Sequence, residues 1–362
     1  MQHENQGFVL PSQAGRLSYA KRVPHGVVGV ISPFNVPLIL SMRAVAPALA
    51  AGNAVLLKPD PQTPVSGGLM IAAVLQAAGL PEGVLHVLPG GAEPGSVICE
   101  SPLVKMIAFT GSTAVGRLIA EAAGRTLKKV TVELGGKSPL LILDDADLDI
   151  AASNAAWGAF LHQGQICMAS GRILVQESIA EEFTHRLATK AAHLPVGNPA
   201  TDQVALGPLI SERQRDRAHA IIQDSIAAGA KLETGGTYER LFYKPTVLSN
   251  VKPGMRAYHE EVFGPCASII TFKTDDEAIA IANDTEYGLS AGIISADVGR
   301  AMKLGERIDS GMLHINDQTV NDECCNPFGG RGCSGNGGNV GVTLVPQMPP
   351  STSALSGHLR KR

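Results

Sequence analysis

Two short glycine-containing segments carry residues that suit covalent and acid–base chemistry. Cys167 lies in the segment Gly164–Met168, directly after an apolar stretch with helical composition. A thiolate at the end of such an element can act as a nucleophile, although most cysteines in apolar surroundings are inert core residues. Glu133 begins the segment Glu133–Lys137, and it can act as a base where burial raises its pKa, although most glutamates lie on the surface. Taken singly, each residue leaves the ordinary structural interpretation open.

A third segment, Gly111–Gly116, has the composition of a phosphate-binding turn. It follows a strand-like run and opens a helix-like one, so its backbone N–H groups and the helix dipole can receive a phosphate. It lacks the Lys and Ser/Thr of a Walker loop, because Arg117-Leu118 occupies those positions, and it does not match G-x-G-x-x-G. Alone, it is more typical of a tight strand-to-helix turn.

The elements that position these segments follow the rhythm of a parallel sheet. Short β-branched or apolar runs at Val27–Ile31, Ala54–Leu57 and Met106–Phe109 alternate with Ala/Leu-rich stretches such as Gly67–Ala78. Each strand-like run ends in a turn-rich segment, and ligands bind at the carboxyl ends of such strands. The sequence therefore predicts an α/β fold with a ligand site at one edge of a parallel sheet.

A second α/β unit is expected after a seam near residue 134. Strand-like Leu140–Leu143 is followed by a helix-like run from Asp147 to Leu161. From Asn316 onward the chain is rich in Gly, Pro and Cys, and residues 338–362 form a Pro/Ser-containing tail that we expect to be poorly ordered.

Composition narrows the class of protein. The 362 residues are 44% hydrophobic and 17% charged, enough for a large core and about two domains. A net charge of −3, with no Lys/Arg stripe, argues against a nucleic-acid partner. Pro33 and Pro37 interrupt the apolar stretch Gly26–Leu40, so we expect no membrane span, and the polar N-terminus lacks the pattern of a secretory signal. A cytoplasmic location is therefore expected, with six reduced cysteines and no metal site.

The order in which several motifs occur gives the single residues their meaning. In chain order, these motifs are Ser32-Pro33-Phe34-Asn35, Leu57-Lys58-Pro59, Phe109 to Gly116, Glu133 to Lys137, Gly164-Gln165-Ile166-Cys167, Glu261-Val262-Phe263-Gly264-Pro265 and Pro327-Phe328-Gly329-Gly330. Together they resemble the aldehyde dehydrogenase superfamily over roughly residues 7 to 337. The segments Ala156–Gln165 and His314–Thr319 are most similar to the NAD-dependent benzaldehyde dehydrogenase type.

The resemblance implies a domain plan. It implies an oligomerisation arm over residues 7–23, a partial Rossmann-type NAD(P)-binding domain over 24–134 and an α/β catalytic domain over 135–333. It also implies that the chain is N-terminally truncated and has an altered C-terminus after Gly338. We therefore expect the cofactor sheet to be incomplete and the extended segment Ser12–Val23 to be at risk of lacking its partner strand, whereas an intact arm would make the chain a homo-oligomer.

The same resemblance implies a reaction. Cys167 would add to the carbonyl of an aldehyde, while the side-chain amide of Asn35 and the backbone N–H of Cys167 hold the oxyanion. Hydride would pass to a nicotinamide, leaving a thioester that a water activated by Glu133 hydrolyses to a carboxylic acid.

Binding roles follow position by position. Lys58 would contact the adenosine ribose, and Glu261 with Phe263 would hold the nicotinamide ribose and ring. The remaining residues implied to line the cofactor are Ser32, Pro33, Phe34, Gly91, Gly95, Gly111, Ser112, Thr113, Ala114, Val115, Gly116 and Leu134. Candidates for an apolar pocket wall are Val36, Leu40, Leu161, Ile166 and Met168.

The choice of cofactor and the choice of substrate are both left open by single residues. Pro61 stands where many NAD-preferring relatives have a ribose-binding glutamate, so NAD is favoured and NADP stays open. The subgroup favours an aromatic or bulky apolar aldehyde, although Arg43 would suit an acidic semialdehyde.

The abnormal ends motivate a different hypothesis, a catalytically silent homologue that retains only dinucleotide or subunit binding. Acyl transfer to coenzyme A is disfavoured because Glu133 provides a base for water.

Overall fold

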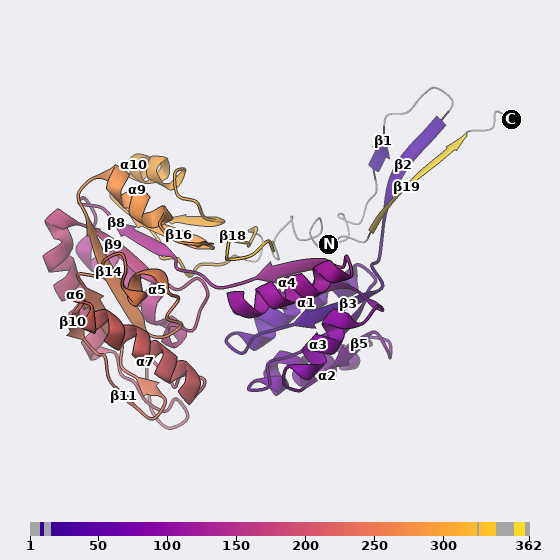
Figure 1. Cartoon of the computed structure of the whole chain (residues 1–362), viewed down its shortest axis with the longest axis horizontal. Coiled ribbons are helices and arrows are strands. Elements are labelled where there is room, and N and C mark those ends of the chain that lie inside the picture. The colour runs from indigo at the N-terminus through magenta and orange to yellow at the C-terminus, as the bar shows by residue number, and fades with distance from the viewer. Residues whose placement is uncertain (1–7, 11–15, 324–325, 338–350, 359–362) are drawn as a thin grey trace. The chain divides into compact units, whose positions relative to one another are not determined.

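The structure is a computed structural model that describes residues 8–10, 16–323, 326–337 and 351–358. The chain divides into two compact units (Figure 1). The first contains the described residues of Met1–Glu133, Glu323–Gly329 and Asn336–Arg362, and the second those of Leu134–Asp322 and Gly330–Gly335. The division after Glu133 falls one residue from the expected seam. The described residues of Glu323–Gly329 belong to the first unit, whereas the expected catalytic domain over 135–333 included them.

The first unit is built on a five-stranded parallel sheet with the order β5-β4-β3-β6-β7. The three strand-like runs of the sequence all lie in this sheet, which confirms the predicted α/β class. Their apolar side chains are largely buried, as expected for strands covered on both faces. The strands are β3 (Val27–Ile31), β4 (Ala54–Lys58), β5 (Leu85–Val87), β6 (Val104–Thr110) and β7 (Lys129–Glu133).

Helices connect successive strands of this sheet. The expected helix Gly67–Ala78 begins as a π-helical turn, η1, and continues as α2. Helix α1 packs with η1, and α3 packs with α4, so the connecting helices form two packed groups. The helices are α1 (Pro37–Ala50), η1 (Val65–Leu69), α2 (Met70–Ala77), α3 (Glu93–Glu100) and α4 (Thr113–Arg125).

The second unit contains a seven-stranded sheet with the order β10-β13-β14-β9-β8-β16-β17. Its strands are parallel except for β10, which pairs antiparallel with β13. They are β8 (Pro139–Ile142), β9 (Arg172–Gln176), β10 (Lys231–Thr234), β13 (Thr246–Ser249), β14 (Cys266–Phe272), β16 (Ser290–Ile294) and β17 (Met312–Ile315). Short pairs are formed by β11 (Tyr238–Glu239) with β12 (Phe242–Tyr243), and by β15 (Tyr287–Gly288) with β18 (Arg331–Gly332).

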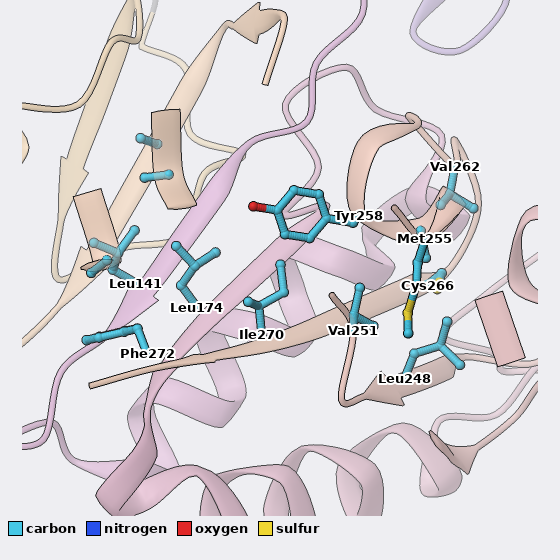
Figure 2. Close-up of a cluster of buried hydrophobic side chains, with 14 of the residues drawn as sticks. Leu141, Leu174, Leu248, Val251, Met255, Tyr258, Val262, Cys266, Ile270 and Phe272 are labelled. Atoms are coloured by element: carbon cyan, nitrogen blue, oxygen red, sulfur yellow. The ribbon is translucent and has the colours of Figure 1, made fainter. Parts of the chain in front are cut away.

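Two apolar clusters cover the faces of this sheet. One gathers Leu141, Leu174 and Ile270 with Tyr258, Met255 and Phe272 (Figure 2). The other packs α5 and α6 against residues of β8, β9 and β14. The helices of the unit are α5 (Leu148–Phe160), η2 (Leu161–Gly164), η3 (Glu177–Ile179), α6 (Ala180–His193), α7 (Glu212–Ala227), α8 (Arg256–His259), α9 (Asp275–Asn283) and α10 (Val298–Gly305).

A separate three-stranded antiparallel sheet contains β1 (Phe8–Leu10), β2 (Arg16–Val23) and β19 (Ser351–His358). Strand β2 lies in the middle, and its Val23 and Arg16 pair with Ser351 and His358 of β19. The extended arm therefore has partners on both edges within the chain. The expected tail over residues 338–362 contains β19, and its residues 338–350 and 359–362 lie outside the described residues.

Within the described ranges, we find no helix with the length and hydropathy required to cross a membrane.

Candidate active site

The candidate residues of the first unit gather at the carboxyl edge of its sheet. Residues 32–35 follow β3, Lys58 ends β4, Gly91 follows β5, and Glu133 ends β7. Segment 111–116 follows β6, the neighbour of β3 on the other side from β4. Connections leaving β3 and β6 run in opposite directions along the sheet, which makes this the topological switch point where open α/β sheets bind ligands.

A buried hydroxyl group stabilises the loop that follows β3. Ser41 Oγ, in α1, lies 2.7 Å from both Ser32 Oγ and the carbonyl oxygen of Gly67, and the N–H of Ser32 donates to the carbonyl of Lys58 at 3.1 Å. Asn35 is 8% exposed and lies just before α1, whose first residue is Pro37. A buried amide fixed at a helix start is suited to donate to a developing negative charge.

The turn after β6 presents the N-terminus of α4. Ser112 is its N-cap, and its Oγ accepts a hydrogen bond from Val115 N–H at 3.4 Å. Gly111 is required, because a Cβ there would lie 2.5 Å from Cζ of Phe109. Val115 is 44% exposed, whereas Gly116 is buried against the sheet. The thirteen-residue helix thus directs a positive dipole end to the switch point.

Lys58 and the two glycines after β5 differ in their surroundings. Lys58 is 8% exposed, and burial lowers the pKa of its amine while Asp60 raises it. This is not the surface charge that a lysine usually forms. Gly91 has no neighbour within 4 Å of an ideal Cβ, and Gly95 meets only Ile31 Cδ1 at 3.8 Å. Space beside these glycines is therefore open for a ligand.

Glu133 has the most unusual environment of the first unit. It is 4% exposed, and neither carboxyl oxygen has a hydrogen-bond partner among the described residues. Burial raises the pKa of Glu133 to about 8, and Arg43 opposes that rise. Gly337 packs so closely on this carboxyl that an ideal Cβ at Gly337 would collide with Oε1. A carboxyl group in this state has the basicity needed to accept a proton near neutral pH.

Arg43 is held in place by an aromatic ring. Its Cζ lies 4.4 Å from the centroid of the Phe328 ring, and Phe328 is 3% exposed. Stacking of a guanidinium group on an aromatic face is favourable and restricts its position. The segment Glu323–Gly329 therefore contributes to the environment of Glu133 through Arg43, a contribution that the sequence does not show.

The candidate nucleophile of the second unit lies in a tight turn after η2. His162 and Gln163 have φ values of 52° and 58°, and Gly164 has a φ of 67°. The N–H of Ala169 donates to the carbonyl of Ile166 at 3.0 Å, so Cys167 occupies the middle of a four-residue turn. Such left-handed residues cost energy and are typical of functional sites. Cys167 is half-buried.

Buried hydroxyl groups brace this turn. Thr319 is fully buried, and its Oγ1 donates to the carbonyl of Met168 at 2.6 Å and lies 2.8 Å from Ser170 Oγ. The backbone of Gly136 packs against the carbonyl of Cys167 without room for a side chain. The position of Cys167 is therefore fixed by the segment after Glu133 and by the loop after β17. The sequence identified the segment of Thr319 only as a mark of the subgroup.

Glu261 lies beside the glycines of the same segment. Its Oε1 accepts a hydrogen bond from Gly136 N–H at 3.0 Å, and a Cβ at Gly135 would lie 2.6 Å from Oε2. Burial of the carboxyl group raises the pKa of Glu261 to about 7, although the residue as a whole is half-buried. Phe263 is half-buried with a φ of 51°, and Leu134 is buried, with its N–H bound to Ser334.

The five candidates for a pocket wall fall into two groups. Val36 and Leu40 lie at the start of α1 next to Asn35, and both are half-buried. Leu161, Ile166 and Met168 surround Cys167 in the sequence, and only Met168 is buried. Each group adjoins its own candidate catalytic residue.

The comparisons with known proteins identify the family. A family model described as the aldehyde dehydrogenase family matches residues 1–348. The chain belongs to the aldehyde dehydrogenase family. This confirms the resemblance seen in the motifs, and family membership makes the protein an oxidoreductase by class.

Among its relatives, the chain is 59% identical to a vanillin dehydrogenase of Amycolatopsis sp. and 52% identical to a benzaldehyde dehydrogenase [NAD(+)] of Pseudomonas putida. Each match covers 92% of this chain and 69% of the relative. A solved structure of a salicylaldehyde dehydrogenase from Pseudomonas putida G7, complexed with salicylaldehyde, is 38% identical, with a TM-score of 0.95 over 99% of this chain and 75% of that one. The aldehyde dehydrogenase fold is thereby confirmed.

Proposed function

We propose that this aldehyde dehydrogenase oxidises an aromatic aldehyde to the carboxylic acid with NAD(P) as the hydride acceptor. The observation that carries the proposal is the state of Glu133. A carboxyl group that is buried, has no hydrogen-bond partner within the described residues, and has a pKa of about 8 is costly for a protein to maintain. A role as a base explains why this group lies at the carboxyl edge of a sheet, where ligands bind.

Cys167 begins the reaction in this proposal. Its thiolate adds to the aldehyde carbon, forming a C–S bond and turning the carbonyl oxygen into an oxyanion. The side-chain amide of Asn35 and the backbone N–H of Cys167 donate hydrogen bonds to that oxyanion. The tetrahedral carbon can then lose hydride, which a planar aldehyde cannot do, and a thioester on Cys167 results. When bound, the nicotinamide of NAD(P) supplies the acceptor for this hydride.

Glu133 completes the cycle. Its carboxylate takes a proton from water, the resulting hydroxide equivalent attacks the thioester carbon, and the C–S bond breaks. The products are a carboxylic acid and the restored thiolate of Cys167. Because only the ionised carboxylate accepts a proton, hydrolysis of the thioester should accelerate as the pH rises towards about 8.

The residues present fit a dinucleotide. The N-terminus of α4 with Ser112 offers backbone donors and a dipole for the diphosphate, and open space adjoins Gly91. Lys58 offers a buried amine at the end of β4 for the adenosine ribose. Glu261 offers carboxylate oxygens for the nicotinamide ribose, and Phe263, two residues later in the chain, offers a ring for the nicotinamide. Pro61 supplies no acceptor, so we propose NAD as the preferred cofactor, with NADP accepted more weakly.

The proposed substrate class rests on the relatives and on the apolar side chains near Asn35 and Cys167. Two relatives are named for vanillin and benzaldehyde, and a third was solved with salicylaldehyde. The candidates Val36, Leu40, Leu161, Ile166 and Met168 would provide apolar contacts for an aromatic ring. Arg43 is already engaged with the Phe328 ring, which supports an aromatic substrate over an acidic semialdehyde.

The test is the formation of NADH by the purified chain with benzaldehyde, vanillin and succinic semialdehyde. We expect kcat/KM to be higher for the aromatic aldehydes, the product to be the acid and not an acyl-CoA, and Cys167→Ala to abolish turnover. A preference for succinic semialdehyde would refute the aromatic assignment. Binding of NAD without any turnover would instead support the catalytically silent homologue.

A further inference from the structure

Lys137 is a buried cation without an obvious function. It lies in the loop between β7 and β8 and is 1% exposed, and its Nζ has no hydrogen-bond partner in the described part of the chain. The side chain lies along Gly171, where a Cβ would be 3.1 Å from Cδ and 3.6 Å from Nζ. An ammonium group buried in this way is unfavourable unless a nearby negative charge compensates it.

Four charged or titratable groups affect the pKa of Lys137. Three of them cannot supply the negative charge that would compensate its ammonium group. Arg172 is itself a cation, and its guanidinium donates to backbone carbonyls, including that of Lys137 at 3.3 Å. Burial raises the pKa of the Cys266 thiol to about 11, so this thiol is neutral at neutral pH. Glu260 already pairs with Arg256, with Oε1 2.5 Å from Nε.

Glu261 is the remaining group. Its carboxylate is bound by the N–H of Gly136, the residue next to Lys137. Within the described residues, no lysine or arginine nitrogen lies within ion-pair distance of this carboxylate; Arg217 donates at 2.8 Å to the backbone carbonyl of Glu261. One loop therefore contributes both a direct hydrogen bond and a buried positive charge to the same carboxylate.

We propose that Lys137 is a positioning residue for Glu261: its buried ammonium group keeps this carboxylate ionised, and so able to accept hydrogen bonds from the hydroxyl groups of the cofactor ribose. The inference rests on the role proposed above for Glu261. A neutral carboxylic acid would accept these hydrogen bonds more weakly, because charge-assisted hydrogen bonds are roughly twice as strong as neutral ones.

The titration of the two groups agrees with this geometry. Burial is the main cause that raises the pKa of Glu261 to about 7, while the Gly136 hydrogen bond, Arg217 and Lys137 lower it. Burial likewise lowers the pKa of Lys137 to about 8; Cys266, Glu261 and Glu260 raise that pKa, and Arg172 lowers it. Arg217 is 43% exposed, so water and salt screen its effect, whereas the charge of Lys137 is shielded from both.

The test measures the Kd for NAD by titration in the absence of aldehyde, at pH 7 and pH 9. Lys137→Met keeps the length of the side chain and removes its charge. If this raises the pKa of Glu261 by about one unit, the Kd should increase about fivefold at pH 7 and less than about 1.5-fold at pH 9. In a Glu261→Gln background, which has no charge to stabilise, Lys137→Met should change the Kd at neither pH.

Two results would overturn the proposal: an unchanged Kd for Lys137→Met at pH 7, or an equal increase in both backgrounds. Arg217→Met is the comparison for an exposed cation, and its effect should disappear at high salt while that of Lys137→Met persists. If Glu261→Gln binds NAD as tightly as the wild type, the proposed role of Glu261 fails. If Glu261→Gln weakens binding and Lys137→Met does not, only the present inference fails.

Lys137→Gln provides a second neutral variant, and thermal unfolding checks that each variant folds. If neither folds, NMR titration of 13C-labelled lysines in the wild type and in Glu261→Gln decides the question. We expect one lysine that titrates near pH 8, with a lower pKa in Glu261→Gln because the negative charge is lost. An identical titration in both proteins would show that the two groups do not interact, and the proposal would be wrong.

Discussion

At the scale of single residues, two ionisable groups are notable for their burial. Glu133 and Lys137 are both buried at the ends of one short segment, and neither has a hydrogen bond to its charged group among the described residues. Burial moves their pKa values from opposite sides to about 8. Each group can therefore exchange a proton near neutral pH, which an ordinary glutamate or lysine cannot.

In this account, Arg43 adjusts the pKa of Glu133, the proposed base. It lowers the pKa of Glu133, which burial raises, and stacking on Phe328 fixes its position. Arg43→Met should therefore raise the pKa of Glu133 above about 8. Since the carboxylate is the active form, the acidic limb of the kcat profile should move to higher pH, with a loss of several-fold at pH 7 and recovery at higher pH.

The measurement is kcat against pH with saturating aldehyde and NAD. Arg125→Met is the matched control, because Arg125 pairs with Glu121 on the exposed surface of α4, away from the carboxyl edge. It should leave the profile unchanged. A loss of activity in Arg43→Met that is the same at every pH would show that Arg43 acts on substrate binding and not on the titration of Glu133.

At the scale of elements, the residues with proposed roles lie where strands end, where helices begin and in tight turns. The parallel strands β3, β4, β6 and β7 bring Asn35, Lys58, Ser112 and Glu133 to one edge. Left-handed residues within η2, together with the turn that follows it, position Cys167. The site therefore depends on regular structure in the first unit and on a strained turn in the second.

The cap of α4 should matter for both stability and binding. Ser112→Ala removes the acceptor for Val115 N–H, which should lower the free energy of unfolding by about 1 kcal/mol. It should also raise the Kd for NAD, because the first turn of α4 is less well ordered. Chemical denaturation and NAD titration measure the two effects.

Thr274→Ala is the matched control for that variant. Thr274 caps α9 in the same way, accepting from Glu277 N–H at 3.2 Å, and it belongs to no part of the proposed site. It should produce a similar loss of stability and leave the Kd for NAD unchanged. Equal binding effects of the two variants would show that Ser112 acts only through global stability.

The sequence predicts three of the five strands of the first sheet closely, because apolar or β-branched runs bounded by turn residues have few alternatives. It cannot show that the Glu133 carboxyl group lacks hydrogen-bond partners within the described residues, since its surroundings depend on Gly337 and Phe328, far along the chain. Nor can it assign left-handed backbone to His162 and Gln163, which are not glycines. Lys137 belongs to a motif visible in the sequence, but its burial follows from the packing of Gly171.

At the scale of the whole molecule, the residues with proposed roles are divided between the two compact units. The first unit carries the proposed base and most of the proposed dinucleotide contacts, and the second carries the proposed nucleophile and the Lys137–Glu261 pair. A third element, the sheet of β1, β2 and β19, exposes Leu17 and Tyr19, which are 42% and 36% exposed. Self-association through this sheet stays a prediction.

The central claim is that Cys167 forms a thioester that Glu133 then hydrolyses. The most direct measurement is rapid mixing of Glu133→Gln with NAD and benzaldehyde, followed by mass spectrometry of the trapped protein. We predict a burst of about one NADH per active site, slow turnover afterwards, reduced roughly 100-fold to 10,000-fold, and an acyl group on Cys167. Turnover at the wild-type rate without a burst, or an acyl group on any other residue, would contradict the account.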